Sequence, residues 1–203
     1  MDTKLNFLNL CDTLPTPSVL LFQHGSGGAG ELAVAWKVIR NCGPGWRHPF
    51  VFSSAPTLDL SDAFGNHLAP LAAPNGSAFE LRPLTCGRQL GRAAGAGHSD
   101  EVSVRNGMPR GAYHANLYSA GLLLAASSGL APGAKAVFKF HPSLWIGVVD
   151  QAREGAVLAP AEVCPDSVEM SLRGLASADL VMRDADDEDG PGYRFTLENI
   201  ERF

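Results

Sequence analysis

The segment that most resembles a functional motif is the glycine-rich stretch 25–30, GSGGAG, which fits the spacing GxGxxG. In nucleotide-binding folds such a loop joins a strand to a helix, and its backbone amides bind a pyrophosphate. Here a strand-like run, 18–23, precedes the loop, and residues 31–40 follow it with apolar side chains at helical spacing. The first acidic candidates, Asp59 and Asp62, lie beyond the expected offset. Because residues 31–40 also alternate well enough for a strand, we do not expect a dinucleotide cofactor.

The same loop, read from His24 as HGSGG, is similar to the oxyanion-hole turn of esterases. Those enzymes hold their nucleophile in a GxSxG elbow, and this chain contains no GxSxG motif. An enzyme with its site at loop 24–30 therefore stays an alternative, and we lean against catalysis.

The histidines and acidic residues give weak metal signals. The six histidines contain no HxH or HxxxH pair, although His98 lies close in sequence to Asp100 and Glu101. The acidic run 184–189, DADDED, places Asp184, Asp186 and Glu188 at alternate positions, which suits calcium. The EF-hand template fails, because positions 189 and 195 carry aspartate and phenylalanine where glycine and glutamate are needed. We expect a solvated acidic loop and no bound metal.

Aromatic side chains could form a surface for a sugar or a protein partner, because an aromatic ring with a polar edge suits half-buried interfaces. Trp36 and Trp145 lie within apolar runs and are expected in the core, whereas Trp46, between glycine and arginine, is expected to be exposed. The candidate ligand-binding residues are Trp46, Tyr113, Tyr118 and His98.

Charge and composition exclude some classes of protein. The net charge of −5 and the lack of a lysine and arginine cluster argue against nucleic-acid binding. No apolar run approaches the roughly 18 residues of a membrane span. The N-terminal sequence has no signal-peptide pattern, so we expect the cytoplasm by default, with signal-independent export left open. The four cysteines, which form no CxxC motif, are expected to be free thiols.

Turn residues and alternation predict an all-β fold. The 22 glycines and 14 prolines separate short apolar runs, as in proteins with many turns. Residues 113–118, 122–126, 135–140 and 144–149 are predicted to form a four-stranded meander, with a proline–glycine turn at 131–133. We predict one antiparallel β-sandwich, jelly-roll or immunoglobulin-like, that spans residues 1–203 as a single domain.

Two segments are predicted to be loops. Residues 53–78 are rich in small and polar residues and are expected to be a long connection anchored by Leu58, Leu60 and Phe64. Residues 85–99 are glycine-rich and are expected to form a mobile loop. No repeat of fixed period and no domain boundary is evident in the sequence.

Three short motifs carry a resemblance to a known family. They are LAVAWK at 32–37, FHPSLWIG at 140–147 and EGAVL at 154–158, and their order and spacing cover residues 19–160. In these motifs the chain resembles a family of small, uncharacterised bacterial all-β proteins whose members are often labelled ring-opening dioxygenases. The resemblance implies a strand for residues 32–39. It implies no catalytic residue, and the chain lacks an arranged set of two histidines and a carboxylate for iron.

Three classes of function remain. The leading hypothesis is a non-enzymatic structural protein that self-associates into oligomers, filaments or inclusions, because many short strands leave edges that can pair. The second is a lectin-like module that binds carbohydrate or another partner through exposed aromatic residues. The third is the enzyme with its site at loop 24–30. No cofactor is expected in any of the three.

Overall fold

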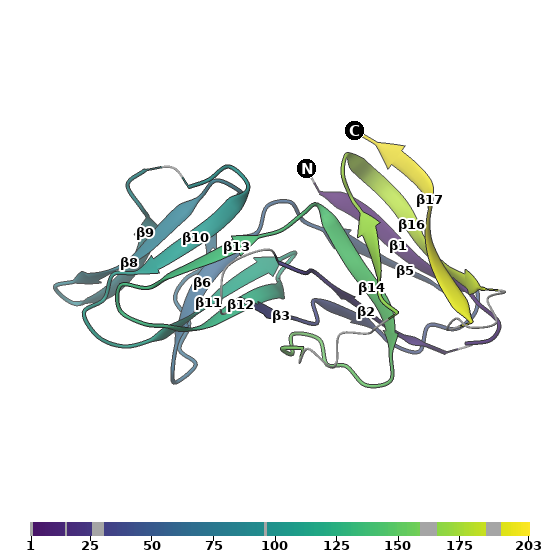
Figure 1. The fold of residues 1–203 in the computed structure, drawn as a ribbon, viewed down its shortest axis with the longest axis horizontal. Helices are drawn as coiled ribbons and strands as arrows, with labels where there is room; N and C mark the ends of the chain where they lie inside the picture. Colours follow the sequence, from purple (N-terminus) through teal and green to yellow (C-terminus); the bar gives the residue numbers. More distant parts are fainter. Residues whose placement is uncertain (1, 15, 26–30, 96, 159–165, 186–191) are drawn as a thin grey trace. The chain divides into compact units, whose positions relative to one another are not determined.

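The computed structural model describes residues 2–14, 16–25, 31–95, 97–158, 166–185 and 192–203. These residues form strands and no helix, which confirms the predicted all-β class (Figure 1). None of their elements is a helix long and apolar enough to cross a membrane. The strands are β1 (Thr3–Leu10), β2 (Ser18–Phe22), β3 (Glu31–Ala33), β4 (Lys37–Ile39), β5 (Arg47–Phe52), β6 (Thr57–Asp62), β7 (Leu71–Ala72), β8 (Ala78–Leu84), β9 (Gly87–Arg92), β10 (Glu101–Asn106), β11 (Tyr113–Ser119), β12 (Leu122–Leu130), β13 (Lys135–Lys139), β14 (Ser143–Val149), β15 (Val168–Ser171), β16 (Leu175–Asp184) and β17 (Tyr193–Arg202).

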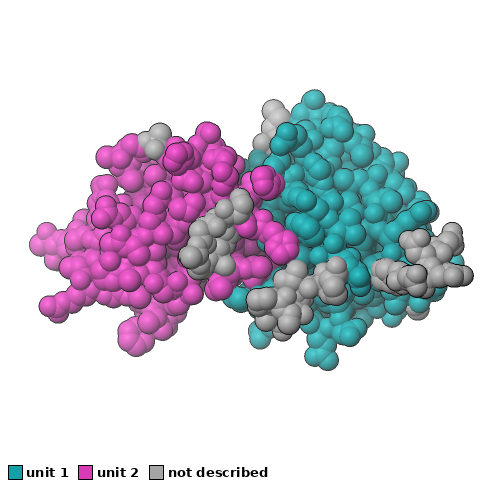
Figure 2. Space-filling model, in the orientation of Figure 1, with its two compact units in different colours: residues 1–23, 35–54, 142–203 teal, residues 24–34, 55–141 magenta. Residues whose placement is uncertain are grey.

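The strands belong to two compact units, coloured separately in Figure 2. Unit 1 comprises residues 1–23, 35–54 and 142–203, and it contains two four-stranded sheets, β17-β16-β1-β5 and β15-β14-β2-β4. Its core includes Phe7, Leu144 and Trp36, all buried, and the Trp36 ring meets the Phe52 ring edge-on at 5.2 Å between centroids. Packed aromatic and aliphatic side chains of this kind supply most of the stabilisation of a sandwich.

Unit 2 comprises residues 24–34 and 55–141, with a four-stranded sheet, β13-β10-β8-β9, and a five-stranded sheet, β3-β12-β11-β6-β7. Leu58, Leu60 and Leu117 of the second sheet are buried, as are Phe79 and Phe138 of the first. The alternation in β13 explains its orientation, because Ala136 and Phe138 are buried on one face between the lysines of the other.

The two units share one arrangement of strands, which reveals a repeat that the sequence conceals. The first repeat consists of a leading set, β1, β2, β4 and β5, and a trailing set, β6 to β9. The second repeat consists of a leading set, β10 to β13, and a trailing set, β14 to β17. In each unit a leading set pairs with a trailing set in the same order. The pair β1–β16 is parallel, as is the corresponding pair β10–β8, and every other strand pair of the described residues is antiparallel. The chain is therefore two successive eight-stranded repeats, with β3 added at the edge of β12.

Two buried asparagines make the repeat visible in atomic detail. Asn9 is the second-last residue of β1, Asn106 is the last residue of β10, and both are buried. Each side-chain oxygen accepts a hydrogen bond from the backbone N–H two residues later, and each Nδ2 donates to two carbonyl oxygens. The acceptors are Leu14 and Cys42 for Asn9, at 3.2 and 2.8 Å, and Gly111 and Leu130 for Asn106, at 3.0 and 2.9 Å.

The repeats have exchanged their halves. Unit 1 joins the leading set of the first repeat to the trailing set of the second, and unit 2 joins the other two sets. Neither repeat therefore builds a sandwich from its own strands alone. The strand pairings described above lie within one unit or the other. The single domain predicted for residues 1–203 therefore stays a prediction.

Three sequence predictions about local structure need correction. The four strands predicted between residues 113 and 149 are present, but only β11 and β12 pair with each other; β13 pairs with β10, and β14 pairs with β2 and β15. Residues 53–78 contain β6 and β7, and residues 85–99 contain β9. The predicted strand at 32–39 is confirmed as β3 and β4, with a break at Ala35 and Trp36.

Candidate functional site

A cluster of polar side chains lies on one face of the five-stranded sheet of unit 2. It comprises residues of β6 and β11 together with a histidine of the loop after β6. Leu58 and Leu60 point to the core, so the alternate residues of β6 point to the opposite face. We call this cluster the polar face and define it as Asp59, Ser61, His67, His114, Asn116 and Tyr118.

Strand register brings these side chains together. Asn116 lies opposite Asp59, His114 lies opposite Ser61, and an isolated bridge pairs Ser61 with His67 on the other side. Directly opposed residues project to the same face at about 5 Å. The result is a row of histidine, serine and histidine next to the Asp59 carboxylate.

Asp59 organises the polar face. Its side chain is 8% exposed, and its carboxylate accepts hydrogen bonds from Asn116 Nδ2 at 2.8 Å, from His67 Nδ1 at 2.9 Å and from Tyr118 Oη at 3.4 Å. Asn116 Nδ2 also donates to Ser61 Oγ at 3.1 Å. A buried carboxylate needs such donors, because an unpaired charge inside a protein is strongly destabilising.

The bond to Asp59 fixes the His67 ring. An ionised carboxylate has no proton to give, so His67 Nδ1 carries the hydrogen and, in the neutral ring, Nε2 has the lone pair. The His67 side chain is half exposed, whereas its partner is buried. An imidazole oriented in this way can donate or accept a hydrogen bond at a defined position on the surface.

Tyr118 contributes a neutral phenol. Burial, followed by the nearby Asp59 charge and the hydrogen bond to it, raises the pKa of Tyr118 to about 12. The hydroxyl therefore remains protonated at neutral pH and serves as a donor, with part of the ring open to solvent.

A tight loop borders the polar face. The Asp62 carboxylate accepts hydrogen bonds from the Asn66 backbone N–H at 3.0 Å, from Asn66 Nδ2 and from the Phe64 backbone N–H at 3.0 Å. These bonds, those of Asn66 above all, hold the pKa of Asp62 well below its usual range. Arg88 adds an ion pair to Asp62 at 2.9 Å. Phe64, expected to anchor this segment in the core, is 90% exposed at the loop tip. The hydrogen bonds of Asp62, rather than a buried ring, hold the loop.

The structure separates the four candidate ligand-binding residues. Tyr118 alone belongs to the polar face. Trp46 is 63% exposed in unit 1, which confirms its predicted exposure. Trp36 is buried as expected, whereas Trp145, also expected in the core, is half-buried. Tyr113 is buried beneath the Arg88 guanidinium, 5.1 Å from the ring centroid. His98 borders a separate hollow of about 340 Å³ in unit 2, together with Glu101 and Lys135.

The metal candidates do not form a site in the described part of the chain. There, no three histidine, cysteine, aspartate or glutamate side chains are grouped to hold an ion. Asp184 accepts hydrogen bonds from the Asp12 and Thr13 backbone, at 3.0 Å each, and from the Cys11 thiol at 3.1 Å, which makes it a structural cap. Asp186 and Glu188 lie outside the described residues, as does most of loop 24–30. Cys11, Cys42 and Cys86 are free thiols, and burial raises the pKa of Cys42.

Comparison with protein-family models, with curated proteins and with solved structures finds no match for this chain. The fold and the polar face therefore define an all-β protein of two compact units, with a fixed hydrogen-bonding surface on one of them.

Sequence reasoning missed Asp59, Ser61 and His67, since it assigned their segment to a connection. The signal was present as the run TLDLSD at 57–62, in which polar residues alternate with Leu58 and Leu60. By contrast, the shared orientation of His114, Asn116 and Tyr118 follows from their period of two.

Proposed function

We propose that this protein is a non-enzymatic binding module and that the polar face of unit 2 binds a hydroxyl-rich ligand, a carbohydrate. The observation that carries the proposal is the fixed set of hydrogen bonds around Asp59. Asn116, His67 and Tyr118 are already oriented by this carboxylate, so a ligand need not order them. A site whose groups are ordered in advance loses less entropy on binding.

The residues on the surface of this cluster suit sugar hydroxyls. His67 and His114 offer ring nitrogens, and Tyr118 offers a hydroxyl and part of a ring face. Sugars present alternating hydroxyl and C–H surfaces, so a mixture of fixed polar groups and an aromatic ring matches them. The serine of the row lies in a hydrogen bond to Asn116, which supports a role in binding rather than as a nucleophile.

A glycan array with the intact protein tests the proposal, followed by calorimetric titration of any sugar that binds. Tyr118→Phe removes the hydroxyl and its acceptor oxygen, and His67→Ala removes the oriented imidazole, so each should weaken binding about three- to tenfold. His98→Ala, which alters a histidine of the same unit outside the polar face, should bind as the unchanged protein does. Retention of full affinity by both variants of the polar face would exclude this surface.

Self-association is a second candidate, favoured by exposed apolar side chains at both edges of one sheet of unit 1. Val51 of edge strand β5 is 41% exposed, and Ile200 of edge strand β17 is 44% exposed. Exposed edges pair readily, although Pro49 in β5 removes one donor from that edge. Light scattering over a range of concentrations tests this candidate. A constant monomer mass would refute it, and Ile200→Lys should reduce any association.

A further inference from the structure

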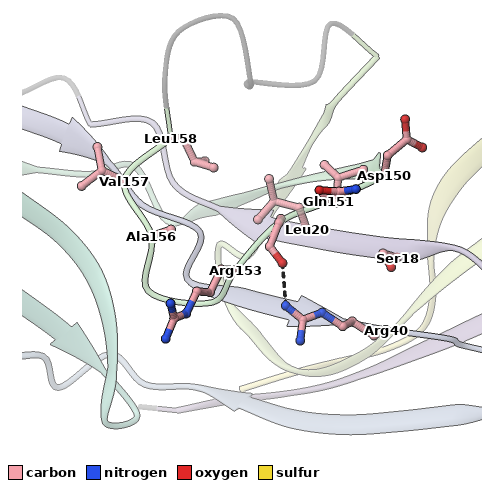
Figure 3. A pocket seen from close by; sticks show the side chains of 11 residues that line it. Ser18, Leu20, Arg40, Asp150, Gln151, Arg153, Ala156, Val157 and Leu158 are labelled. Carbon is pink, nitrogen blue, oxygen red and sulfur yellow. Dashed lines mark hydrogen bonds between the residues drawn. The ribbon is translucent and has the colours of Figure 1, made fainter.

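A pocket of about 550 Å³ opens on unit 1 beside β2 and the end of β14 (Figure 3). This volume falls within the range of small-molecule sites, roughly 300–1,000 Å³. Leu20 of β2 lines it, and apolar side chains that include Val157 and Leu158 form another wall. Val157 is 47% exposed and offers apolar surface to a ligand, whereas Leu20 is fully buried and Leu158 nearly so.

Two arginines give the pocket a positive side. The side chains of Arg40 and Arg153 lie on the same side of it, whereas the Asp150 carboxylate is at the other end (Figure 3). Arg40 Nη2 donates to the Ala152 carbonyl at 2.6 Å, which positions its guanidinium and leaves its other donors available. The Arg153 guanidinium makes no hydrogen bond or ion pair within the described residues, although the Arg153 carbonyl accepts a bond from the Ala156 N–H. Guanidinium groups match the oxygens of carboxylates and phosphates in both shape and charge.

The pocket occupies the place in its repeat that corresponds to the polar face in the other repeat. It lies against β2 and β14, which correspond to β11 and β6 of the polar face. Asp59 of β6 pairs with Asn116 of β11, and Gly147 of β14 pairs with Leu20 of β2. Asp59 precedes Asp62 by three residues, just as Gly147 precedes Asp150, so Gly147 occupies the position of Asp59.

The loops that follow these strands also correspond. Gly65 and Gly155 have positive φ angles of 78° and 79°, and each is followed, after two residues, by the sequence Leu-Ala-Pro. In those two-residue gaps His67 in unit 2 corresponds to Val157 in unit 1. Unit 1 therefore has Gly147, Leu20 and Val157 where unit 2 has Asp59, Asn116 and His67. The hydrogen-bond network of unit 2 has no counterpart at these positions, and the charged side chains on the positive side of the pocket are those of Arg40 and Arg153.

We infer that this pocket binds a small organic anion, with a carboxylate or phosphate head between Arg40 and Arg153 and an apolar body against Val157 and Leu158. The ligand differs in class from the sugar proposed for the polar face, and the inference does not depend on that proposal. The two repeats would then present different ligand chemistry at corresponding places.

Calorimetric titration of the full chain with hexanoate and with hexyl phosphate tests the inference, with 1-hexanol and hexylammonium as neutral and cationic controls. We expect one anion to bind per chain. The probe that binds more tightly, hexanoate or hexyl phosphate, shows whether the site prefers a carboxylate or a phosphate. Affinity should fall as salt is added, because the arginines are partly open to solvent. Arg153→Gln should weaken binding about tenfold.

Two matched variants complete the test. Arg40→Gln should weaken binding by a similar factor, whereas Arg173→Gln, an exposed arginine of unit 1 outside the pocket, should leave it unchanged. Thermal unfolding without ligand establishes that each variant is folded, and Arg153→Gln breaks no bond of the described structure. The inference is refuted by the absence of 1:1 binding up to about 10 mM anion. Equal binding of hexanol, or full affinity in both the Arg40 and Arg153 variants, would refute it as well.

Discussion

Replacement of Asp59 by alanine should destabilise unit 2 through the loss of one buried hydrogen-bond acceptor. The largest effect comes from Asn116, whose buried amide would keep Ser61 Oγ as its side-chain acceptor. A hydrogen bond to a charged group contributes about 1.5–3 kcal/mol. The bond from Tyr118 is long, and His67 is half exposed and can bind water, so both add little. We expect a total loss of about 2–3 kcal/mol, or about 5–10 °C in Tm.

The assay must report on unit 2. Trp36, Trp46 and Trp145 all lie in unit 1, so tryptophan fluorescence follows that unit, and circular dichroism in urea is needed for the other. A double-mutant cycle with Asn116→Ala isolates the pair, and we expect a coupling free energy of about 1–2 kcal/mol. Additive effects of the two substitutions, within about 0.3 kcal/mol, would refute the view that Asp59 organises the polar face. Asp100→Ala, at an exposed ion pair of the same unit, is the control and should change stability far less.

Three further predictions concern pH and an unpaired nitrogen. Because the folded-state pKa of Tyr118, about 12, lies above the unfolded value, stabilisation by its neutral phenol is complete below about pH 10. It should be lost as pH rises from about 10 to about 12, and a difference titration of ultraviolet absorbance against Tyr118→Phe measures this. The pKa of Asp184 is well below its usual range because of hydrogen bonds from the Asp12 and Thr13 backbone and the Cys11 thiol. Its contribution should be full above about pH 4 and lost as pH falls through the depressed pKa, so Asp184→Asn should flatten the acid side of a stability–pH curve. His48 Nε2 is buried without a hydrogen-bond partner in the described structure, so His48→Leu should raise the free energy of unfolding by up to about 1 kcal/mol in urea denaturation.

Each of these predictions has an outcome that contradicts it. A Tyr118 phenol that titrates near pH 10, as in a free peptide, would show that Asp59 and burial do not act on it. An unchanged acid limb in Asp184→Asn would mean that other carboxylates determine acid unfolding. A loss of more than about 1 kcal/mol in His48→Leu would show that this nitrogen has a partner or that leucine does not fit the site.

The sequence predicted which side chains share one face of a strand better than it predicted which strands pair with each other. Alternation identified the strands from Tyr113 to Val149 and placed Asn116 and Tyr118 on one side, because side chains of a strand project in turn to its two faces. It could not reveal that β14 leaves β13 to pair with β2, because a short apolar strand fits many partners equally well. Asp59 was missed for a related reason, since its partners come from β11 and from the loop after β6.

The internal repeat escaped notice because few residues mark it. Asn9 and Asn106 carry the same hydrogen bonds, and the turns Gly-Pro-Gly at 43–45 and Ala-Pro-Gly at 131–133 occupy corresponding places. Between these positions the side chains differ, and core packing tolerates such exchange when volume and pattern are kept. The repeat is therefore evident in the order and pairing of the strands and not in the identity of most residues.

The exchange of halves between the repeats bears on the physical integrity of the molecule. A break in the backbone between Arg92 and Glu101 would yield two fragments, each of which supplies four or more strands to both sandwiches: the first adds β3 to its four strands in unit 2. The fragments would remain interlocked until both cores came apart. Assembly carries the matching cost: β1 must wait for β16, more than 160 residues later in the chain, before its parallel ladder can close, and such distant pairing slows folding.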